Sequence, residues 1–155
     1  MLLPGDAAPD INLPDLDGVT FRLHDALKQG VVVLAFFKVS CPTCQMTFPF
    51  LQRLSDSTHA GAQLIAISQD DAGDTREFQQ RFGVSMRTLV DARPGYVASN
   101  AFRIGSVPSL FIIEPDGTIA GAAEGFHRAA IEDIGRIFRV IPFKETDHVP
   151  AMRPG

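Results

Sequence analysis

Residues 31–49, VVVLAFFKVSCPTCQMTFP, carry the strongest structural signal in the chain. The seven apolar residues 31–37 are rich in β-branched and aromatic side chains, which favours a strand buried on both faces of a largely parallel sheet. Residues 38–40 interrupt this run. The apolar positions that follow have helical spacing: Met46, Phe50, Leu51 and Leu54. The sequence therefore predicts a central strand, a short break and a helix that opens at two cysteines.

Cys41, Pro42, Thr43 and Cys44 form a Cys-x-x-Cys motif at the start of the predicted helix. Unpaired backbone N–H groups and the helix dipole stabilise negative charge there, so we expect a lowered thiol pKa for Cys41. Pro42 suits the first turn because its missing N–H costs nothing. Cys44 is placed to resolve a bond formed by Cys41. A disulfide over so short a loop contributes only about 2 kcal/mol to stability, so we interpret the pair as redox-active rather than structural.

Three stretches carry a resemblance to a known family: GDAAPDINLPDLDG (5–18), FFKVSCPTCQMTFPFL (36–51) and IGSVPSLFIIEPDGTI (104–119). Together they resemble the thioredoxin superfamily. More narrowly, they resemble the redoxin group of TlpA/ResA-type thiol-disulfide oxidoreductases and AhpC/TSA peroxiredoxins. The similarity runs from about residue 4 to about residue 140. It implies a thioredoxin-like α/β fold, in which helices flank a central mixed sheet and an N-terminal β-hairpin extension precedes the core.

The bulk composition indicates one globular domain. A chain of 155 residues, 45% hydrophobic and 21% charged, has enough material for a proper core. We expect residues 1–141 to form the redoxin domain, with the hairpin extension in 1–24, and residues 142–155 to form a polar C-terminal tail. The net charge of −4 and the scattered basic residues argue against nucleic-acid binding. A monomer is expected.

The sequence contains no apolar run of membrane-spanning length, and its first basic residue is Arg22, so the charged region of a signal peptide is absent. We therefore expect a cytoplasmic protein. The alternative is an extracytoplasmic protein whose leader or anchor precedes Leu2, since TlpA/ResA-like proteins commonly carry one. Two cysteines alone do not decide the compartment.

Turn residues and hydrophobic periodicity divide the rest of the chain into alternating strands and helices. Before the central strand we expect a hairpin within 4–23 and one helical turn at 25–29. After the first long helix the expected elements are strands at 63–68 and 88–90, a helix at 94–103, strands at 109–113 and 118–123, and a helix at 128–140. This alternation is typical of a parallel sheet that ends in an antiparallel pair.

Two of the expected helices carry more detailed predictions. Asp74 and Glu77 are expected to form an N-terminal capping pair for a helix that Gly83 ends. The helix at 128–140 is expected to bury one apolar face, made of Ile131, Ile134, Phe138 and Ile141.

Val107 and Pro108 directly precede the strand at 109–113. Taken alone, Pro108 is an ordinary strand starter, because only about 5–6% of X–Pro bonds in folded proteins are cis. In thioredoxin-like proteins, however, the proline at this place is cis and packs beside the cysteine motif. The residue before it offers its backbone to an extended substrate. The resemblance therefore implies a cis bond here and a substrate-binding role for Val107 and Pro108.

The chain departs from the family pattern around the cysteines. Ala35 and Thr47 stand where related oxidoreductases place a carboxylate, so the proton of Cys44 is expected to pass to water or to a group that the sequence does not identify. Ser40 replaces the aromatic residue that commonly precedes the first cysteine. We consider Lys38 and Ser40 as modulators of the thiol pKa at the motif, the alternative for Lys38 being a solvated loop lysine.

The four histidines share no helix face or short motif with the cysteines: His24, His59, His127 and His148. We expect each of them to be a surface or cap residue. A structural zinc site needs about four ligands, and no second Cys-x-x-Cys or His-x-x-x-His motif occurs. Neither a bound metal nor a cofactor is expected.

Three functions remain open. In a thiol-disulfide oxidoreductase, the Cys41 thiolate attacks a protein or small-molecule disulfide, Cys44 resolves the product, and an external reductant or oxidant restores the pair. In a thiol peroxidase, Cys41 attacks peroxide instead. Lys38 and Leu34 stand where peroxiredoxins have Thr or Ser and Pro. A Sco-like copper protein would use both cysteines and a distant histidine such as His127, but that family spaces its cysteines further apart.

Overall fold

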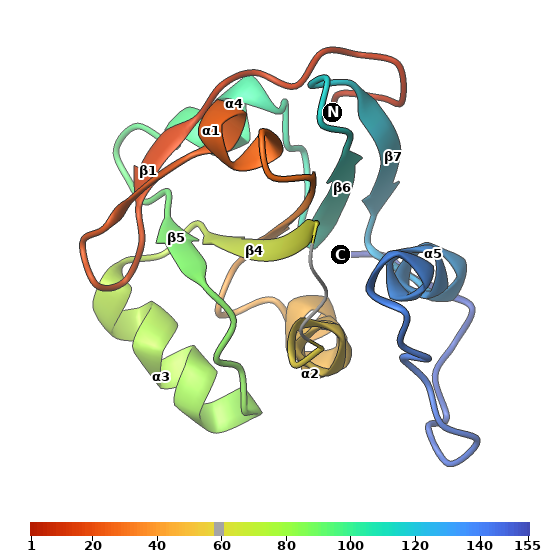
Figure 1. Ribbon diagram of the computed structural model, residues 1–155. Helices are drawn as coiled ribbons and strands as arrows, with labels where there is room; N and C mark the ends of the chain where they lie inside the picture. The colour runs from red at the N-terminus through yellow and green to blue at the C-terminus, as the bar shows by residue number, and fades with distance from the viewer. Residues whose placement is uncertain (58–60) are drawn as a thin grey trace.

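The computed structural model describes residues 1–57 and 61–155, and it places a mixed β-sheet between two layers of helices (Figure 1). The strands of this sheet, in spatial order, are β5 (Thr88–Val90), β4 (Ala62–Ser68), β3 (Val31–Phe37), β6 (Ser109–Ile113) and β7 (Ile119–Glu124). One face is covered by α1 (Leu23–Leu27) and α4 (Val97–Ala101). The other is covered by α2 (Pro42–Ser55), α3 (Ala72–Phe82) and α5 (Arg128–Phe138). Across the described residues, a helix with the length and apolar character needed to span a membrane is not found.

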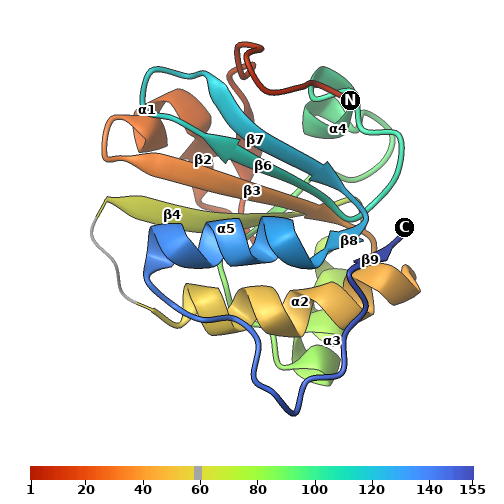
Figure 2. The same cartoon turned by 90° about the vertical axis from the view of Figure 1, so that its right-hand side faces the viewer.

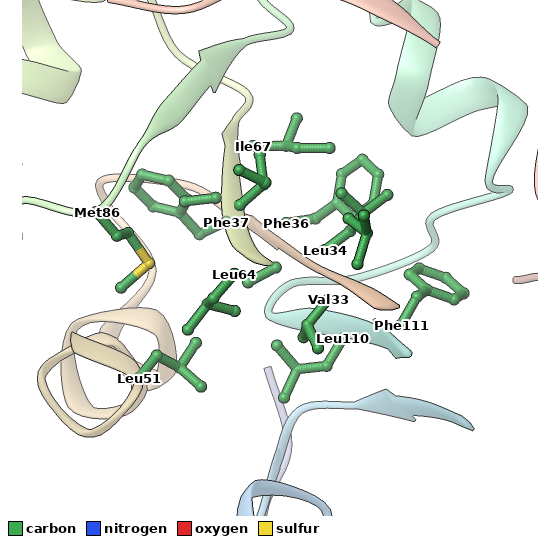
Figure 3. Packing of buried hydrophobic residues seen from close by; sticks show 14 of the residues in the cluster. Val33, Leu34, Phe36, Phe37, Leu51, Leu64, Ile67, Met86, Leu110 and Phe111 are labelled. Atoms are coloured by element: carbon green, nitrogen blue, oxygen red, sulfur yellow. The ribbon is translucent and has the colours of Figure 1, made fainter. Parts of the chain in front are cut away.

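Strand β3 lies in the middle of the sheet, parallel to β4 and antiparallel to β6. Residues 32–37 are all fully buried because successive side chains point to opposite faces and both faces are covered. The Phe36 ring lies 5.9 Å from that of Phe111, whereas the Phe37 ring lies 4.4 Å from that of Phe48 in α2. Figure 3 shows the labelled side chains of the two faces, with Leu34, Phe36, Ile67 and Phe111 on one side and Val33, Leu51, Leu64 and Leu110 on the other. The predicted central strand is confirmed.

The predicted N-terminal hairpin is also present. It consists of β1 (Asn12–Pro14) and β2 (Thr20–Arg22), which pair antiparallel. Isolated bridges join Asp15 to Leu89 in β5 and Ala7 to Thr118 near β7. The extension therefore touches both edges of the central sheet, so it restricts access to the unpaired strand edges.

Two helix starts differ from the predictions. Helix α1 begins at Leu23 rather than at residue 25. Helix α3 is capped by Asp71, whose Oδ1 accepts the backbone N–H of Asp74 at 2.8 Å, so the predicted cap at Asp74 is wrong. The helix begins three residues earlier than expected, which places Asp74 in its first turn. Gly83 ends α3 in a left-handed conformation (φ +66°), as predicted.

Helix α4 is shorter than the helix predicted at 94–103. Pro94 is bound to Arg93 through a cis peptide bond and lies before the helix, which begins only after Tyr96. The buried carboxylate of Asp91 accepts the backbone N–H groups of Ala98 and Ser99 at 3.0 and 2.7 Å. This carboxylate satisfies two otherwise unpaired donors of the first turn, and it explains why the helix starts there.

Helix α5 ends at Phe138 because Arg139 adopts a left-handed conformation (φ +56°). Ile131, Ile134 and Phe138 are buried as predicted. Ile141, however, is 86% exposed, so its predicted place on the buried face is wrong. The helical period that would have turned it inward stops three residues before it.

The chain beyond α5, residues 142–155, runs back along α2 and is called the return segment below (Figure 2). Its Phe143 is buried, with the ring 4.9 Å from that of Phe50 in α2. Near its end β9 (Met152–Arg153) pairs antiparallel with β8 (Phe126–His127). The sequence predicted only a polar tail here and did not indicate these contacts.

Candidate active site

The two cysteines lie where β3 leads into α2. Cys41 is the N-cap residue of α2, and its Sγ accepts the backbone N–H of Cys44 at 3.1 Å. Pro42 occupies the first helical position, as expected. Cys41 is partly exposed, whereas Cys44 is fully buried, and both are free thiols. The predicted placement of the motif at a helix N-terminus is confirmed.

Burial is the main influence on the pKa of the Cys44 thiol. Removal from water raises the pKa of the Cys44 thiol far above its usual value, and the contact with Cys41 raises this pKa further. The backbone of Lys38 opposes the shift, while the negative charge of Asp70 adds to it. Cys44 therefore stays a neutral thiol until a base removes its proton.

Val107 meets Cys41 across 66 residues of chain: the Cys41 thiol donates to the Val107 carbonyl at 3.4 Å. Val107 is almost fully buried, and the Val107–Pro108 peptide bond is cis, as expected. The two sequence motifs that the resemblance singled out thus lie together in space.

Asp70 is a neighbour of the dithiol that the sequence reading missed. It lies two residues after the end of β4, and its Oδ2 accepts the backbone N–H of Val39 at 2.8 Å. Because β3 and β4 are parallel, their carboxyl ends meet at one edge of the sheet. A polar residue just after the second predicted strand could therefore have been expected near the cysteines. Thr47, where relatives place a carboxylate, is buried and donates to the carbonyl of Thr43 at 2.6 Å.

Lys38 and Ser40 flank the site without a described contact from their side chains to the cysteine sulfurs. The Lys38 carbonyl accepts the backbone N–H of Cys41 at 3.2 Å, and Ser40 is exposed. The Lys38 side chain lines a cleft of about 310 Å³, together with Gln69, Asp70, Asp71, Asp74, Ala92, Arg93 and Tyr96. The suggested influence of Lys38 and Ser40 on Cys41 stays a prediction.

Three of the four histidines can be placed. His24 lies 3.7 Å from Asp10, His127 contacts the carbonyl of Glu124 at 2.9 Å, and His148 is exposed. His59 falls outside the described residues. Within the described parts of the chain, no group of three His, Cys, Asp or Glu side chains is arranged to hold a metal ion. The described geometry thus offers no support for a copper site at the cysteines.

The return segment brings further residues to the site. The Thr43 hydroxyl, between the two cysteines, donates to the Pro154 carbonyl at 2.7 Å. Gly155 lies so close to Val107 that a Cβ on it would fall 1.8 Å from the Val107 carbonyl oxygen. No local pattern in the sequence indicates either approach, because the contact partners are far apart in the chain.

Comparison with known proteins agrees with this geometry. The AhpC/TSA family model matches residues 4–122. The chain is 32% identical over 117 residues to the methylamine utilization protein MauD of Paracoccus denitrificans. The aligned region covers 74% of this chain and 56% of that protein. It is 31% identical over 132 residues to a Mycobacterium tuberculosis protein assigned as a peroxiredoxin, covering 78% of this chain and 84% of that one. The chain thus spans only about half the length of its MauD relatives.

Among solved structures, one from Chlorobium tepidum assigned as the thiol:disulfide interchange protein DsbE superposes with a TM-score of 0.75 at 26% identity. The match covers 88% of this chain and 95% of that one. It confirms the predicted thioredoxin-like arrangement, a mixed sheet flanked by helices, with the N-terminal hairpin in place.

Proposed function

The chain belongs to the AhpC/TSA family, and from this premise we propose that it is a thiol-disulfide oxidoreductase that acts through Cys41 and Cys44. The observation that carries the proposal is the unequal exposure of the two thiols at one helix N-terminus. Cys41 is open to an incoming disulfide, and Cys44 is buried behind it. Such a pair suits attack by one sulfur followed by resolution by the other.

In the first step the Cys41 thiolate attacks one sulfur of a substrate disulfide. A bond forms between Cys41 and that sulfur, the substrate S–S bond breaks, and the other substrate sulfur leaves as a thiolate. The N–H of Cys44 points at the Cys41 sulfur and partly neutralises its negative charge before the attack. The backbone of Val107, in contact with the same sulfur, lies beside the mixed disulfide that results.

In the second step Cys44 loses its proton and attacks the Cys41 sulfur. The Cys41–Cys44 disulfide forms, and the second substrate sulfur leaves as a thiolate, so the substrate gains two electrons and the enzyme dithiol loses two. Because burial disfavours the charged form of Cys44, proton removal is the demanding part of this step. The carboxylate of Asp70 binds the backbone N–H of Val39, and its negative charge contributes to the raised pKa of Cys44. In this proposal Asp70 receives the Cys44 proton.

The proposal implies a disulfide-containing protein or small-molecule substrate and an external redox partner that restores the dithiol. Thiol peroxidase activity is the second candidate, favoured by the peroxiredoxin assignment of one relative. Against it stand Lys38 and Leu34, which lack the groups that peroxiredoxins place before the reactive cysteine. The cytoplasmic location and the monomeric state stay predictions.

Trapping distinguishes the roles of the cysteines. Cys44→Ser is expected to accumulate a mixed disulfide with an oxidised protein substrate, because the first step proceeds and the second cannot. Cys41→Ser should accumulate none, since its remaining thiol is buried. Non-reducing electrophoresis and mass spectrometry measure the adducts. Equal trapping by both variants, or peroxide consumption at the rate of an established peroxidase, would replace this proposal.

A further inference from the structure

The last five residues of the return segment, residues 151–155, lie next to the dithiol and are named the C-terminal strap. Within the strap β9 pairs antiparallel with β8, and the backbone N–H of Arg128 donates to the carbonyl of Ala151 at 3.0 Å. Figure 2 shows β9 beside β8 at the N-terminal end of α2. All five strap residues are exposed, so main-chain hydrogen bonds rather than buried apolar side chains hold it in place.

The strap reaches the residues between the two cysteines. Thr43 is only 3% exposed although it lies in the first turn of α2, and its hydroxyl donates to the Pro154 carbonyl at 2.7 Å. The strap therefore sits over the same turn that presents the Cys41 sulfur.

Two glycines allow the backbones to approach this closely. A Cβ on Gly155 would fall 1.8 Å from the Val107 carbonyl oxygen, the atom that accepts the Cys41 thiol at 3.4 Å. A Cβ on Gly125 would fall 2.7 Å from the Arg153 carbonyl oxygen, and Gly125 has a positive φ of +82°. The strap is thus an extended chain in backbone contact with both β8 and Val107.

We propose that the C-terminal strap occupies the surface on which an extended segment of a protein substrate binds, so that a protein disulfide reacts only after the strap has left. The proposal rests on the proposed thiol-disulfide exchange. An extended peptide that adds to a strand edge is held by main-chain hydrogen bonds and is largely independent of sequence. The strap pairs with β8 through its main chain, accepts the Thr43 hydroxyl and lies against the Val107 carbonyl. A substrate segment beside Val107 and the strap therefore exclude each other.

The strap does not seal the site against small molecules. Cys41 remains partly exposed with the strap in place. A small disulfide needs only the sulfur, whereas a polypeptide needs the neighbouring backbone surface as well. The strap therefore selects by size: it slows exchange with protein disulfides and leaves exchange with small disulfides unaffected.

A pair of variants in the full chain isolates the strap. Arg153 stands opposite Phe126 in the β8–β9 ladder. Arg153→Pro removes the N–H that a ladder position needs, whereas Arg153→Ala keeps it and removes only the side chain with its contact to the Met46 sulfur. Gly155→Ala is a second test variant, since its Cβ would collide with Val107. The substrates are insulin, as a protein disulfide, and dithiobis-nitrobenzoate, as a small one.

In Arg153→Pro, the insulin rate should rise by about threefold to tenfold, the factor that one lost hydrogen bond produces, while the dithiobis-nitrobenzoate rate stays unchanged. Gly155→Ala should raise the insulin rate in the same direction, and Arg153→Ala should match the wild type. The strap proposal is overturned if the insulin rate rises in neither test variant, or if it rises equally with both substrates. Either result leaves the proposed function standing. Exchange with neither substrate in the wild type and in every variant overturns the proposed function, and the strap with it.

Discussion

The two ends of α2 are held by the same return segment in different ways. At the C-terminal end of the helix, the Arg53 guanidinium donates to both carboxylate oxygens of Asp147, at 2.6 and 3.2 Å, and to the Pro142 carbonyl at 2.9 Å. At the N-terminal end, which carries the dithiol, the neutral hydroxyl of Thr43 donates to the strap, and Arg153 of the strap contacts the Met46 sulfur at 3.7 Å; all residues of the strap are exposed.

This difference indicates that the ion pair between Arg53 and Asp147 anchors the return segment, whereas the contact between Thr43 and the strap can be released. Bidentate, charge-assisted bonds such as the Arg53–Asp147 pair are stronger and geometrically more demanding than a single neutral bond. The Asp147 side chain is only 16% exposed, so water competes weakly for it. The return segment is therefore held by a charge-assisted pair at the end of α2 far from the cysteines, and beside Cys41 it is held without an ion pair, by neutral bonds to Thr43 and the β8 backbone and by the Arg153 contact with the Met46 sulfur. The experiments below test this contrast, in decreasing order of expected effect.

The middle of the return segment should have the largest effect on stability. Phe143 is 7% exposed and packs on Phe50 and Phe126. Phe143→Ala is expected to cost about 3 kcal/mol of the free energy of unfolding, because it removes a buried ring and leaves a cavity. Ile141→Ala is the control, since Ile141 is 86% exposed and should have no measurable effect. Chemical denaturation measures both. A free energy of unfolding for Phe143→Ala that equals that of the control variant would show that the segment is not anchored here.

Removing the ion pair between Arg53 and Asp147 should have the second-largest effect on stability. Arg53→Met removes both bonds to Asp147, and we expect a loss of about 1 kcal/mol, reduced by the partial exposure of the guanidinium. A thermal midpoint about 2–4 °C lower corresponds to this loss. The control is Arg136→Met, because the Arg136–Asp133 pair is fully on the surface. If the two variants melted alike, the ion pair at the end of α2 would not act as an anchor.

The pH dependence of the anchor follows from Asp147. Its hydrogen bonds to Arg53 and to the Lys144 backbone lower its pKa from 3.8 to about 2. Because the folded pKa lies below the unfolded value, the stabilisation is complete above pH 4 and is lost as the pH falls from about 4 to about 2. Thermal midpoints of the wild type and of Asp147→Asn, measured across this range, should differ at neutral pH and converge in acid. A constant difference down to pH 2 would contradict the assignment.

The smallest effect is expected at the dithiol end. The negative charge of Asp70 raises the pKa of Cys44, so Asp70→Asn should lower this pKa, although burial keeps it above the ordinary value. Asp71→Asn is the matched control, because it removes a neighbouring charge and keeps the cap of α3. The ultraviolet absorbance of the thiolate in a Cys41→Ser background reports the titration. An unchanged or raised Cys44 pKa in Asp70→Asn would remove Asp70 from the proposed proton step.

Local pattern was enough to predict the elements whose signal lies within a few residues. The apolar run of β3 and the Cys-x-x-Cys motif at the start of α2 could be predicted because hydrophobic period and turn residues act over short distances. Errors arose at the ends of helices, where capping groups and backbone conformation rather than hydrophobic period decide the outcome. Helix α4 starts late because the Asp91 carboxylate binds its first N–H groups, and Ile141 is exposed because α5 has already ended.

The candidate site divides in the same manner. The sequence by itself determined the cysteine pair and the helix that carries it, and resemblance to a family indicated Val107 and Pro108. Only the tertiary structure brought Asp70 to the backbone N–H of Val39, two residues before Cys41, and the strap to Thr43, across 111 residues of chain. The physical reason is that the strap binds chiefly through its own main-chain groups, which every residue carries, so no side-chain pattern within the strap indicates its partner in advance.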